Sequence, residues 1–340
     1  RQRQMCIRDR EMSTRLCGSA DLFATEPGRG APASINFVSC HDGFTLTDLT
    51  RYRSKHNEAN GENNNDGSSV NHSANFGVEG VTDDPDVIAA REQAAMNMIG
   101  MLLLSLGTPM MLAGDEFRNT QDGNNNAYCQ DNDITWLKWD WMYSTNKTRE
   151  MRRLETVSRL VALRKSLDLY HHEDFFTRLT QIGLLKPSSR VQWFLPDGTT
   201  PMERDWFDLG VRSFTMRLLS NSEVDVCIVV NGTADDRTFR LPPDTHWTPK
   251  WCSAEINGRR AGHGTQVEEC DLNGDTTVWT QHVPDASETV LKMVEEVAMQ
   301  RTESSTENEA DTIKFAMPVT DHAANGTSSA PRDEVSADMP

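Results

Sequence analysis

INFVSCHDG, at residues 35–43, and GTPMMLAGDEF, at residues 107–117, decide the fold class of this chain. Each is a short, largely apolar run that ends in acidic residues. Such runs are typical of parallel strands that are covered on both faces. We therefore predict one short buried strand at 35–38 and a second at 109–113.

A helical pattern follows each predicted strand. Asp84-Pro85 is a start signal, apolar residues then recur at helical spacing, and Gly107 ends this helix. A second helix is predicted at about 148–165. Two parallel strands cannot bury both of their faces. Residues 31–166 therefore predict the last two strand–helix units of an incomplete TIM (β/α)8 barrel, with the first six units outside this chain.

The second half of the chain has a different pattern. Short β-rich runs alternate with polar turns from about residue 191 to 283, which predicts a C-terminal antiparallel β-sandwich.

Because much of the barrel is missing, we expect Met98 and Leu102 of the first helix to face solvent. The chain divides into a non-native scar, the C-terminal part of the barrel, the sandwich, and a short helix with a disordered acidic tail: 1–12, 13–170, 171–285 and 286–340.

Composition excludes several classes of partner. The 340 residues include 34 Lys and Arg against 51 Asp and Glu, a net charge of −17, which argues against nucleic acid and against a polybasic membrane contact. An uncharged run at 93–114 is long enough to span a bilayer, but Gly107-Thr108-Pro109 breaks it, so no membrane span is predicted. The seven cysteines are widely spaced, which favours a reducing cytoplasm over a disulfide framework or a zinc site.

Residues suited to chemistry follow both predicted strands. His41 and Asp42 come after the first strand, and Asp115 and Glu116 come after the second. In a parallel barrel, reactive groups lie beyond the C-terminal ends of the strands. The loops that follow are rich in Asn, Tyr and Trp, which suit a ligand made of hydroxyls. Structural roles for all of these residues stay open at this point, since Asn-rich loops are commonly solvated turns.

Four longer motifs occur in order along the chain. They are INFVSCHDGFTLTDL, KHNEANGENNNDG, GTPMMLAGDEF and GNNNAYCQDNDITWLKW, at 35–49, 55–67, 107–117 and 123–139. These motifs resemble those of bacterial glycogen debranching enzymes of the isoamylase type, in the α-amylase superfamily of glycoside hydrolases. The resemblance covers residues 13–285, and this chain resembles the C-terminal part of such an enzyme.

The resemblance implies a retaining α-1,6-glucosidase that acts on an α-glucan, either glycogen or limit dextrin, and needs no cofactor. It implies that Asp42 stabilises the transition state and that His41 binds the sugar at the point of cleavage. Further substrate contacts are expected from the polar loops: Asp115, Glu116, Asn124, Asn125, Asn126, Tyr128 and Asp131. Nothing in residues 1–34 matches the nucleophilic Asp or the acid Glu, so this chain alone is expected to be inactive.

Two other functions stay open. One is a different glucan hydrolase of the same superfamily, such as a pullulanase-like enzyme, and the other is a carbohydrate-binding module without catalysis. A calcium loop at 62–73 is a weak match, because Ser73 stands where a bidentate Glu is required. We therefore predict no metal site.

Overall fold

The computed structural model describes the parts of the chain at 9–23, 30–171, 178–179, 185–186, 191–208, 210–219, 224–233, 236–242, 247–257, 269–273 and 276–280. All of these residues belong to one unit, Arg1–Met293. The expected acidic tail at 286–340 and most of the expected scar lie outside the described residues.

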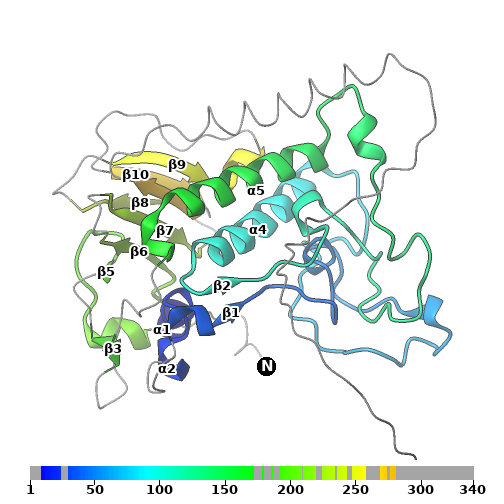
Figure 1. Cartoon of the computed structure of the whole chain (residues 1–340), viewed down its shortest axis with the longest axis horizontal. Coiled ribbons are helices and arrows are strands. Elements are labelled where there is room, and N and C mark those ends of the chain that lie inside the picture. The colour runs from blue at the N-terminus through cyan, green and yellow to red at the C-terminus, as the bar shows by residue number, and fades with distance from the viewer. Residues whose placement is uncertain are drawn as a thin grey trace, which may run out of the picture. The chain divides into compact units, whose positions relative to one another are not determined.

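The regular secondary structure in the first half of the chain is mainly helical, and long loops connect its elements, as Figure 1 shows. Its helices are α1 (Asp9–Leu16), α2 (Ala20–Phe23), α3 (Leu46–Leu49), α4 (Pro85–Leu104) and α5 (Arg149–Ser166). Its 3-10 turns are η1 (Ala31–Ala33), η2 (Glu58–Asn60), η3 (Asp115–Phe117), η4 (Asp140–Tyr143) and η5 (Asp168–His171). The two long helices predicted from the sequence are confirmed as α4 and α5.

Local signals set both ends of α4. The Asp84 side chain accepts a hydrogen bond from the backbone N of Asp86 at 2.9 Å, and Pro85 occupies the first turn. After the helix, Gly107 has a φ of +109°, and a Cβ there would lie 2.8 Å from the carbonyl O of Ser34. Only glycine fits this turn without a shift of the backbone.

By length and composition alone, α4 could cross a bilayer. However, half of its most apolar window is buried inside the structure, where α4 contacts α5 and the 3-10 turn η7 (Ser253–Asn257). A core helix passes the same test of length and composition. The observed packing of α4 is therefore that of a core helix.

The two predicted parallel strands are shorter and more exposed than expected. β1 (Ile35–Asn36) pairs in parallel with β2 (Thr108–Pro109), with Ile35 opposite Thr108. Ile35 and Phe37 are 60% and 54% exposed, so the prediction of a buried strand at 35–38 is wrong, as is that of a strand at 109–113 covered on both faces. Within the described residues, these strands have only each other as ladder partners, and a ladder extends only where a neighbour supplies hydrogen bonds.

The second half of the chain forms the antiparallel strands that its sequence predicts. Five of them lie in the order β5-β6-β7-β11-β9, with the bounds β5 (Val191–Phe194), β6 (Ser213–Leu218), β7 (Val226–Asn231), β11 (Thr276–Thr280) and β9 (Thr248–Cys252). Two further pairs are β8 (Asp236–Arg240) with β10 (Glu269–Asn273), and β3 (Arg178–Leu179) with β4 (Leu185–Lys186). The turn η6 (Glu203–Phe207) lies between β5 and β6 in the chain.

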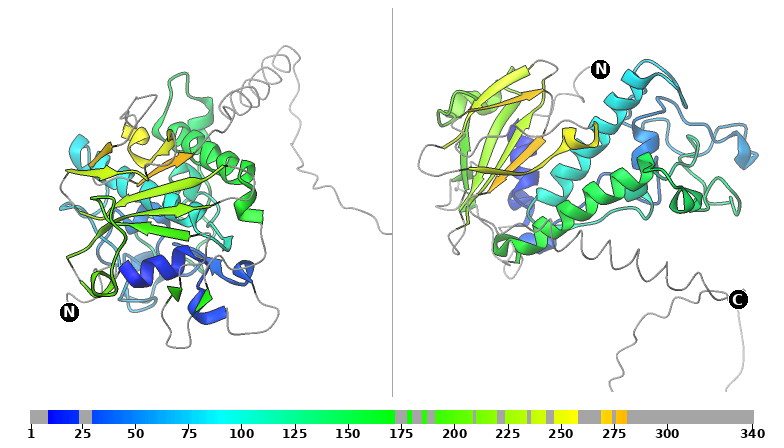
Figure 2. Two further views of the ribbon diagram at one scale, coloured as in Figure 1. Left: turned by 90° about the vertical axis from the view of Figure 1, so that its left-hand side faces the viewer. Right: turned by 90° about the horizontal axis from the view of Figure 1, so that it is seen from above.

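Strands β6 and β7 of the five-stranded sheet are buried along their whole length, and the two long helices lie to one side of this sheet (Figure 2). On one face, Ile228 belongs to the same apolar cluster as Leu103 of α4 and Leu160 of α5. On the other face, Val229 clusters with Phe239 of β8. The sheet therefore connects the helical part of the chain to the β8–β10 pair, because neighbouring residues on a strand point to opposite faces.

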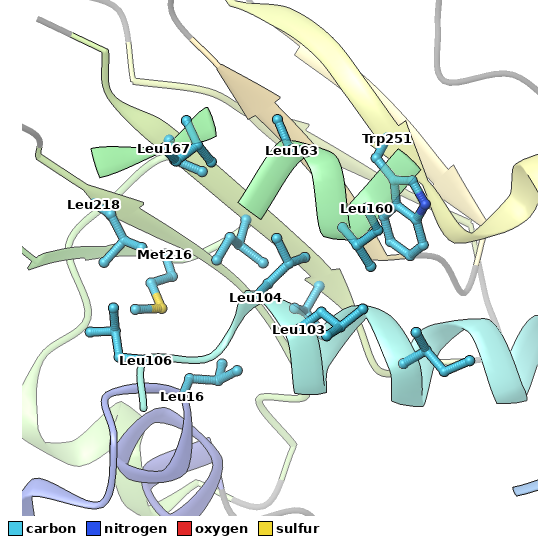
Figure 3. Packing of buried hydrophobic residues seen from close by; sticks show 14 of the residues in the cluster. Leu16, Leu103, Leu104, Leu106, Leu160, Leu163, Leu167, Met216, Leu218 and Trp251 are labelled. Atoms are coloured by element: carbon cyan, nitrogen blue, oxygen red, sulfur yellow. The ribbon is translucent and has the colours of Figure 1, made fainter. Parts of the chain in front are cut away.

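Close contact between α4 and β9 completes the larger core (Figure 3). A Cβ on Gly100 of α4 would lie 2.6 Å from the indole of Trp251, so the glycine makes room for this ring. Leu102 is only 7% exposed, and Met98 packs against the same core. The expectation that these two side chains face solvent is therefore wrong. For Met98, the reason is that the C-terminal sheet contributes to the core on which this side chain packs.

Candidate functional site

His41 and Asp42 lie on a bend in the segment that connects β1 to α3. Their side chains are 87% and 83% exposed, and His41 Nε2 lies 3.5 Å from Asp42 Oδ2. Gly43 follows with a φ of +97°, a conformation that favours glycine, and its N donates to the carbonyl O of Asn125 at 3.0 Å. The two functional groups are thus solvent-accessible on a turn whose backbone is tied to the second polar loop.

Asp115, in η3, is buried and holds the segment that carries His41. Its Oδ2 accepts a hydrogen bond from Ser39 Oγ, and its Oδ1 accepts one from the backbone N of Leu46 at 2.9 Å. Burial raises the pKa of Asp115 to about 6, although the two hydrogen bonds oppose this effect. Both carboxylate oxygens are therefore engaged within the protein, and a contact of Asp115 with sugar stays a prediction.

Glu116 lies next to Asp115 but contacts a different segment. Its Oε2 accepts a hydrogen bond from the backbone N of Gly114 at 2.9 Å, and Gly114 has a φ of +99°. The side chain of Glu116 is half-buried. The two neighbouring carboxylates thus hold different parts of the backbone.

The asparagine clasp is a set of five amide side chains that joins the loop at 55–75 to the loop at 119–132. Its members are Asn57, Asn60, Asn124, Asn125 and Asn126. Asn57 Nδ2 donates to Asn125 Oδ1 at 2.9 Å, and the backbone N of Asn125 donates back to Asn57 Oδ1 at 3.0 Å. Both residues are buried, at 0% and 3% exposed.

A second group of bonds extends the clasp to a carboxylate. Asn124 Nδ2 donates to Asn60 Oδ1 at 2.8 Å, and Asn60 Nδ2 donates to Asp66 Oδ2 at 2.6 Å. Asn126 Nδ2 donates to the same oxygen of Asp66 at 2.9 Å. The amides of the three predicted asparagines are thus engaged inside the protein, and their contact with sugar stays a prediction.

Lys55 stabilises the same loop from within. Its Nζ donates to the carbonyl O of Asn65, Asp66 and Gly67 at 3.2, 2.6 and 3.2 Å. The Lys55 ammonium group thus donates to the backbone of the loop at 62–73, which is the segment that weakly matches a calcium loop. Across the described parts of the chain, no group of three or more His, Cys, Asp and Glu side chains is arranged to hold a metal ion.

The remaining predicted residues lie at the outer side of the second loop. Tyr128 is 72% exposed. Asp131 Oδ1 accepts a hydrogen bond from Trp136 Nε1 at 2.9 Å, and Trp136 is 55% exposed. Trp139, by contrast, packs on Phe117, with ring centroids 4.8 Å apart. The side chains of Tyr128, Asp131 and Trp136 are therefore accessible to a ligand.

A buried ion-pair network joins α4, α5 and Arg118, and no pattern in the sequence predicted it. Arg153 of α5 is 0% exposed and pairs with Glu92 of α4 at 2.8 Å, while Arg118 Nε pairs with Glu92 at 2.7 Å. Burial acts to raise the pKa of Glu92, but the charges of the two arginines hold it below its usual value. Arg153 also donates to the carbonyl O of Asp115 at 3.4 Å. The network therefore connects both long helices to η3.

Other missed residues are Ser39, Lys55 and Asn57. The last two fall within the KHNEANGENNNDG motif, so the motif was the available signal for them. No local pattern signals Ser39, because its partner Asp115 lies far along the chain.

Similarity to solved structures places the fold with that of pullulanases. The structure matches 82% of its length to a pullulanase from Anoxybacillus sp. LM18-11 complexed with maltotetraose, and covers 31% of that chain, with a TM-score of 0.53 and 17% identity. An apo pullulanase from Paenibacillus barengoltzii gives a TM-score of 0.51 at 16% identity, over 81% of this chain and 34% of its own. At such identities, the similarity shows the fold alone. No family model matches the chain.

Sequence comparison identifies nearer relatives. A glycogen operon protein GlgX homolog from Mycobacterium bovis is 44% identical over 207 residues, which are 60% of this chain and 28% of the relative. A glycogen debranching enzyme from Pectobacterium atrosepticum is 37% identical over 260 residues, which are 76% of this chain and 36% of the relative. The chain thus spans about a third of the length of the curated relatives it matches. Its resemblance to bacterial glycogen debranching enzymes is confirmed.

Proposed function

We propose that this chain is the C-terminal part of a glycogen debranching enzyme, a retaining α-1,6-glucosidase that acts on the branch points of glycogen or limit dextrin. One observation carries the proposal. The His41-Asp42 pair is exposed in the segment that follows the parallel strand β1, in a chain 37–44% identical to glycogen debranching enzymes and GlgX homologs. Reactive groups of parallel barrels occupy this position.

The proposed architecture is the last two strand–helix units of a (β/α)8 barrel, followed by an antiparallel β-sandwich. Two observations support it. The β1–β2 pair leaves Ile35, Phe37 and Met110 exposed, as expected for strands whose further neighbours lie outside this chain. The antiparallel sheet also clusters through Val229 with the β8–β10 pair, as two packed sheets do.

In the proposed reaction, Asp42 is the carboxylate that stabilises the oxocarbenium-like transition state, and His41 donates hydrogen bonds to hydroxyls of the same sugar. Tyr128 offers an exposed ring on which a sugar can stack. The nucleophile and the general acid are two further carboxylates, which we place in the part of the enzyme that precedes this chain. The 340-residue chain is therefore proposed to be inactive by itself.

The proposal also includes a cytoplasmic location. Cys40 and Cys129 are free thiols, which suits a reducing compartment.

The test compares the 340-residue chain with a version extended at its N-terminus from the source gene to the length of the relatives. We expect the extended protein to release reducing ends from limit dextrin, and the 340-residue chain to release none. In the extended protein, Asp42→Asn is expected to lower kcat by several orders of magnitude. Tyr143→Phe is the matched control, because Tyr143 is 87% exposed and lies outside the proposed site.

Three outcomes separate the alternatives. Cleavage of pullulan in preference to limit dextrin would favour a pullulanase-like enzyme. Binding of glycogen without any turnover in the extended protein would favour a carbohydrate-binding module. Full activity of the Asp42→Asn variant would contradict the role proposed for this carboxylate.

A further inference from the structure

We propose that Asp115 is a positioning residue that fixes both ends of the segment 39–46 and thereby holds His41 and Asp42 in their working orientation. This inference rests on the proposed function of Asp42. It assigns to Asp115 a task different from sugar binding, since the residue is 2% exposed.

The geometry that carries this inference is a single carboxylate shared between two chain ends. Ser39 precedes His41 and donates through its hydroxyl to one oxygen of Asp115, while Leu46 begins α3 and donates through its backbone N to the other oxygen. A carboxylate has two oxygens and can accept both bonds at the same time. Loss of the carboxylate therefore releases both ends together.

Between these two ends, residues 41–42 are exposed, whereas Phe44 and Thr45 are buried and two further hydrogen bonds restrain the segment. The backbone N of Gly43 donates to the carbonyl O of Asn125 at 3.0 Å, and Thr45 Oγ1 donates to the carbonyl O of Asn119 at 3.1 Å. Both bonds lead to the second polar loop, whereas Asp115 belongs to η3. Without Asp115, the segment would remain attached to the second loop while its connection to η3 is lost.

The surroundings of Asp115 explain why this restraint is rigid. Arg153 donates to its carbonyl O at 3.4 Å, and Arg153 is itself held by Glu92 at 2.8 Å. Two charged groups, Arg153 and the neighbouring Glu116, act electrostatically on the Asp115 carboxylate. The restraint on His41 thus extends through Asp115 to the buried ion pair between α4 and α5.

The experiment measures backbone amide exchange and the ring C–H resonances of His41 in the 340-residue chain, so it does not depend on catalysis. Asp115→Ala is expected to speed exchange in residues 40–46 by about tenfold to a hundredfold, because two hydrogen bonds to a charged group are lost. The His41 resonances, assigned with a His41→Gln variant, are expected to move toward those of an unstructured peptide. Ser39→Ala should give a smaller change of the same kind, and Ser39→Thr should restore the wild-type values because it retains the hydroxyl.

Asp48→Ala is the matched control. Asp48 is an equally buried carboxylate, and it accepts hydrogen bonds from Thr120 Oγ1 and from the backbone N of Gln121. It also interacts with Thr45 near the second end of the segment 39–46, but not with Ser39 at the first end. We expect this variant to speed exchange near residues 45 and 120 and to leave the His41 resonances in place. Equal changes at His41 in the Asp115 and Asp48 variants would overturn the inference.

Two further results keep the inference distinct from the proposed function. If Asp115→Ala does not fold, unchanged His41 resonances in Ser39→Ala would overturn the inference. If the extended protein proves inactive while Ser39→Ala moves the His41 resonances and Ser39→Thr restores them, the positioning contact stands and the debranching function fails.

Discussion

The five-stranded sheet and the asparagine clasp are both buried, yet different interactions order them. Ile228 of the sheet and Asn57 of the clasp are each 0% exposed. Ile228 is held by apolar contacts that have no required direction, whereas Asn57 needs a particular partner, Asn125, at hydrogen-bonding distance. A buried amide that loses its partner lowers the free energy of unfolding by about 1–3 kcal/mol. An apolar core side chain, in contrast, can be replaced by another of similar shape at a smaller cost.

This difference separates two tasks within one chain. The apolar core supplies stability in proportion to the area that it buries. The clasp buries polar groups, so its net contribution to stability is small, and what it fixes is the relative position of two loops. Four variants or conditions can test this comparison.

The largest expected effect is in the apolar core. Trp251→Ala removes the indole that packs on Gly100 and should lower the free energy of unfolding by about 3–5 kcal/mol. Urea denaturation followed by circular dichroism measures this change. Tyr128→Ala, at a 72% exposed position, is the control and should change stability by less than about 0.5 kcal/mol. A loss below about 1 kcal/mol for Trp251→Ala would show that the core is not what stabilises the chain.

The next effect depends on pH and on Asp115. Its folded pKa of about 6 lies above the ordinary value of 3.8, so the folded state binds this proton more tightly than the unfolded state does. The free energy of unfolding should therefore rise as pH falls through 6 toward 4, by up to about 3 kcal/mol from this group. Asp115→Asn carries no titrating proton and should lack this component. Parallel pH series of wild type and variant give the difference, and identical slopes would contradict it.

An effect of similar size is expected where a glycine gives the clasp its room. Gly61 and Gly67 both have positive φ values, of +79° and +71°, but a Cβ on Gly61 meets nothing within 4 Å, whereas one on Gly67 would lie 2.7 Å from Asn57 Nδ2. Gly61→Ala should therefore cost about 1 kcal/mol for the backbone alone. Gly67→Ala should cost about 1–3 kcal/mol more and should speed amide exchange at residues 124–126. Equal costs for both variants would show that the clasp adjusts to the extra methyl group.

The smallest effect is expected at the exposed edge of the second loop. Trp136→Phe removes the hydrogen bond from Trp136 Nε1 to Asp131 but keeps a large ring. Because Trp136 is 55% exposed, water replaces the lost partner, and the free energy of unfolding should change by less than about 1 kcal/mol. Thermal melting checks this value, and a larger loss would mean that the outer loop has a structural role.

Features with local causes could be predicted from the sequence. The helix start at Asp84-Pro85 and the glycine turn at Gly107 depend on neighbouring residues, and the structure contains both. The apolar runs near Ile35 and Met110 were misleading, because the extent and burial of a parallel strand depend on its neighbours in the sheet. Apolar character alone does not supply those neighbours.

The candidate site was predictable only in part for the same reason. His41 and Asp42 stand beside each other in the sequence and could be recognised as a pair. The bonds of Asp115 to Ser39 and of Asn57 to Asn125 join residues 76 and 68 positions apart. Such pairings can be assigned only from the folded structure, since a single sequence does not indicate which side chains lie within hydrogen-bonding distance.

The asparagine clasp contains a residue that is prone to slow chemical change. Asn60 is followed by Gly61, a pair in which the backbone N of the glycine readily attacks the side-chain amide carbon. Ammonia leaves, and water opens the resulting succinimide to aspartate or isoaspartate. Here the Asn60 amide donates to the Asp66 carboxylate and to the carbonyl O of Asn126. Conversion to aspartate would replace that donor with an anion that faces another anion. Ageing of the protein in storage, followed by mass spectrometry, should therefore separate a fraction with loosened loops from an intact one, and equal amide exchange in both fractions would contradict this consequence.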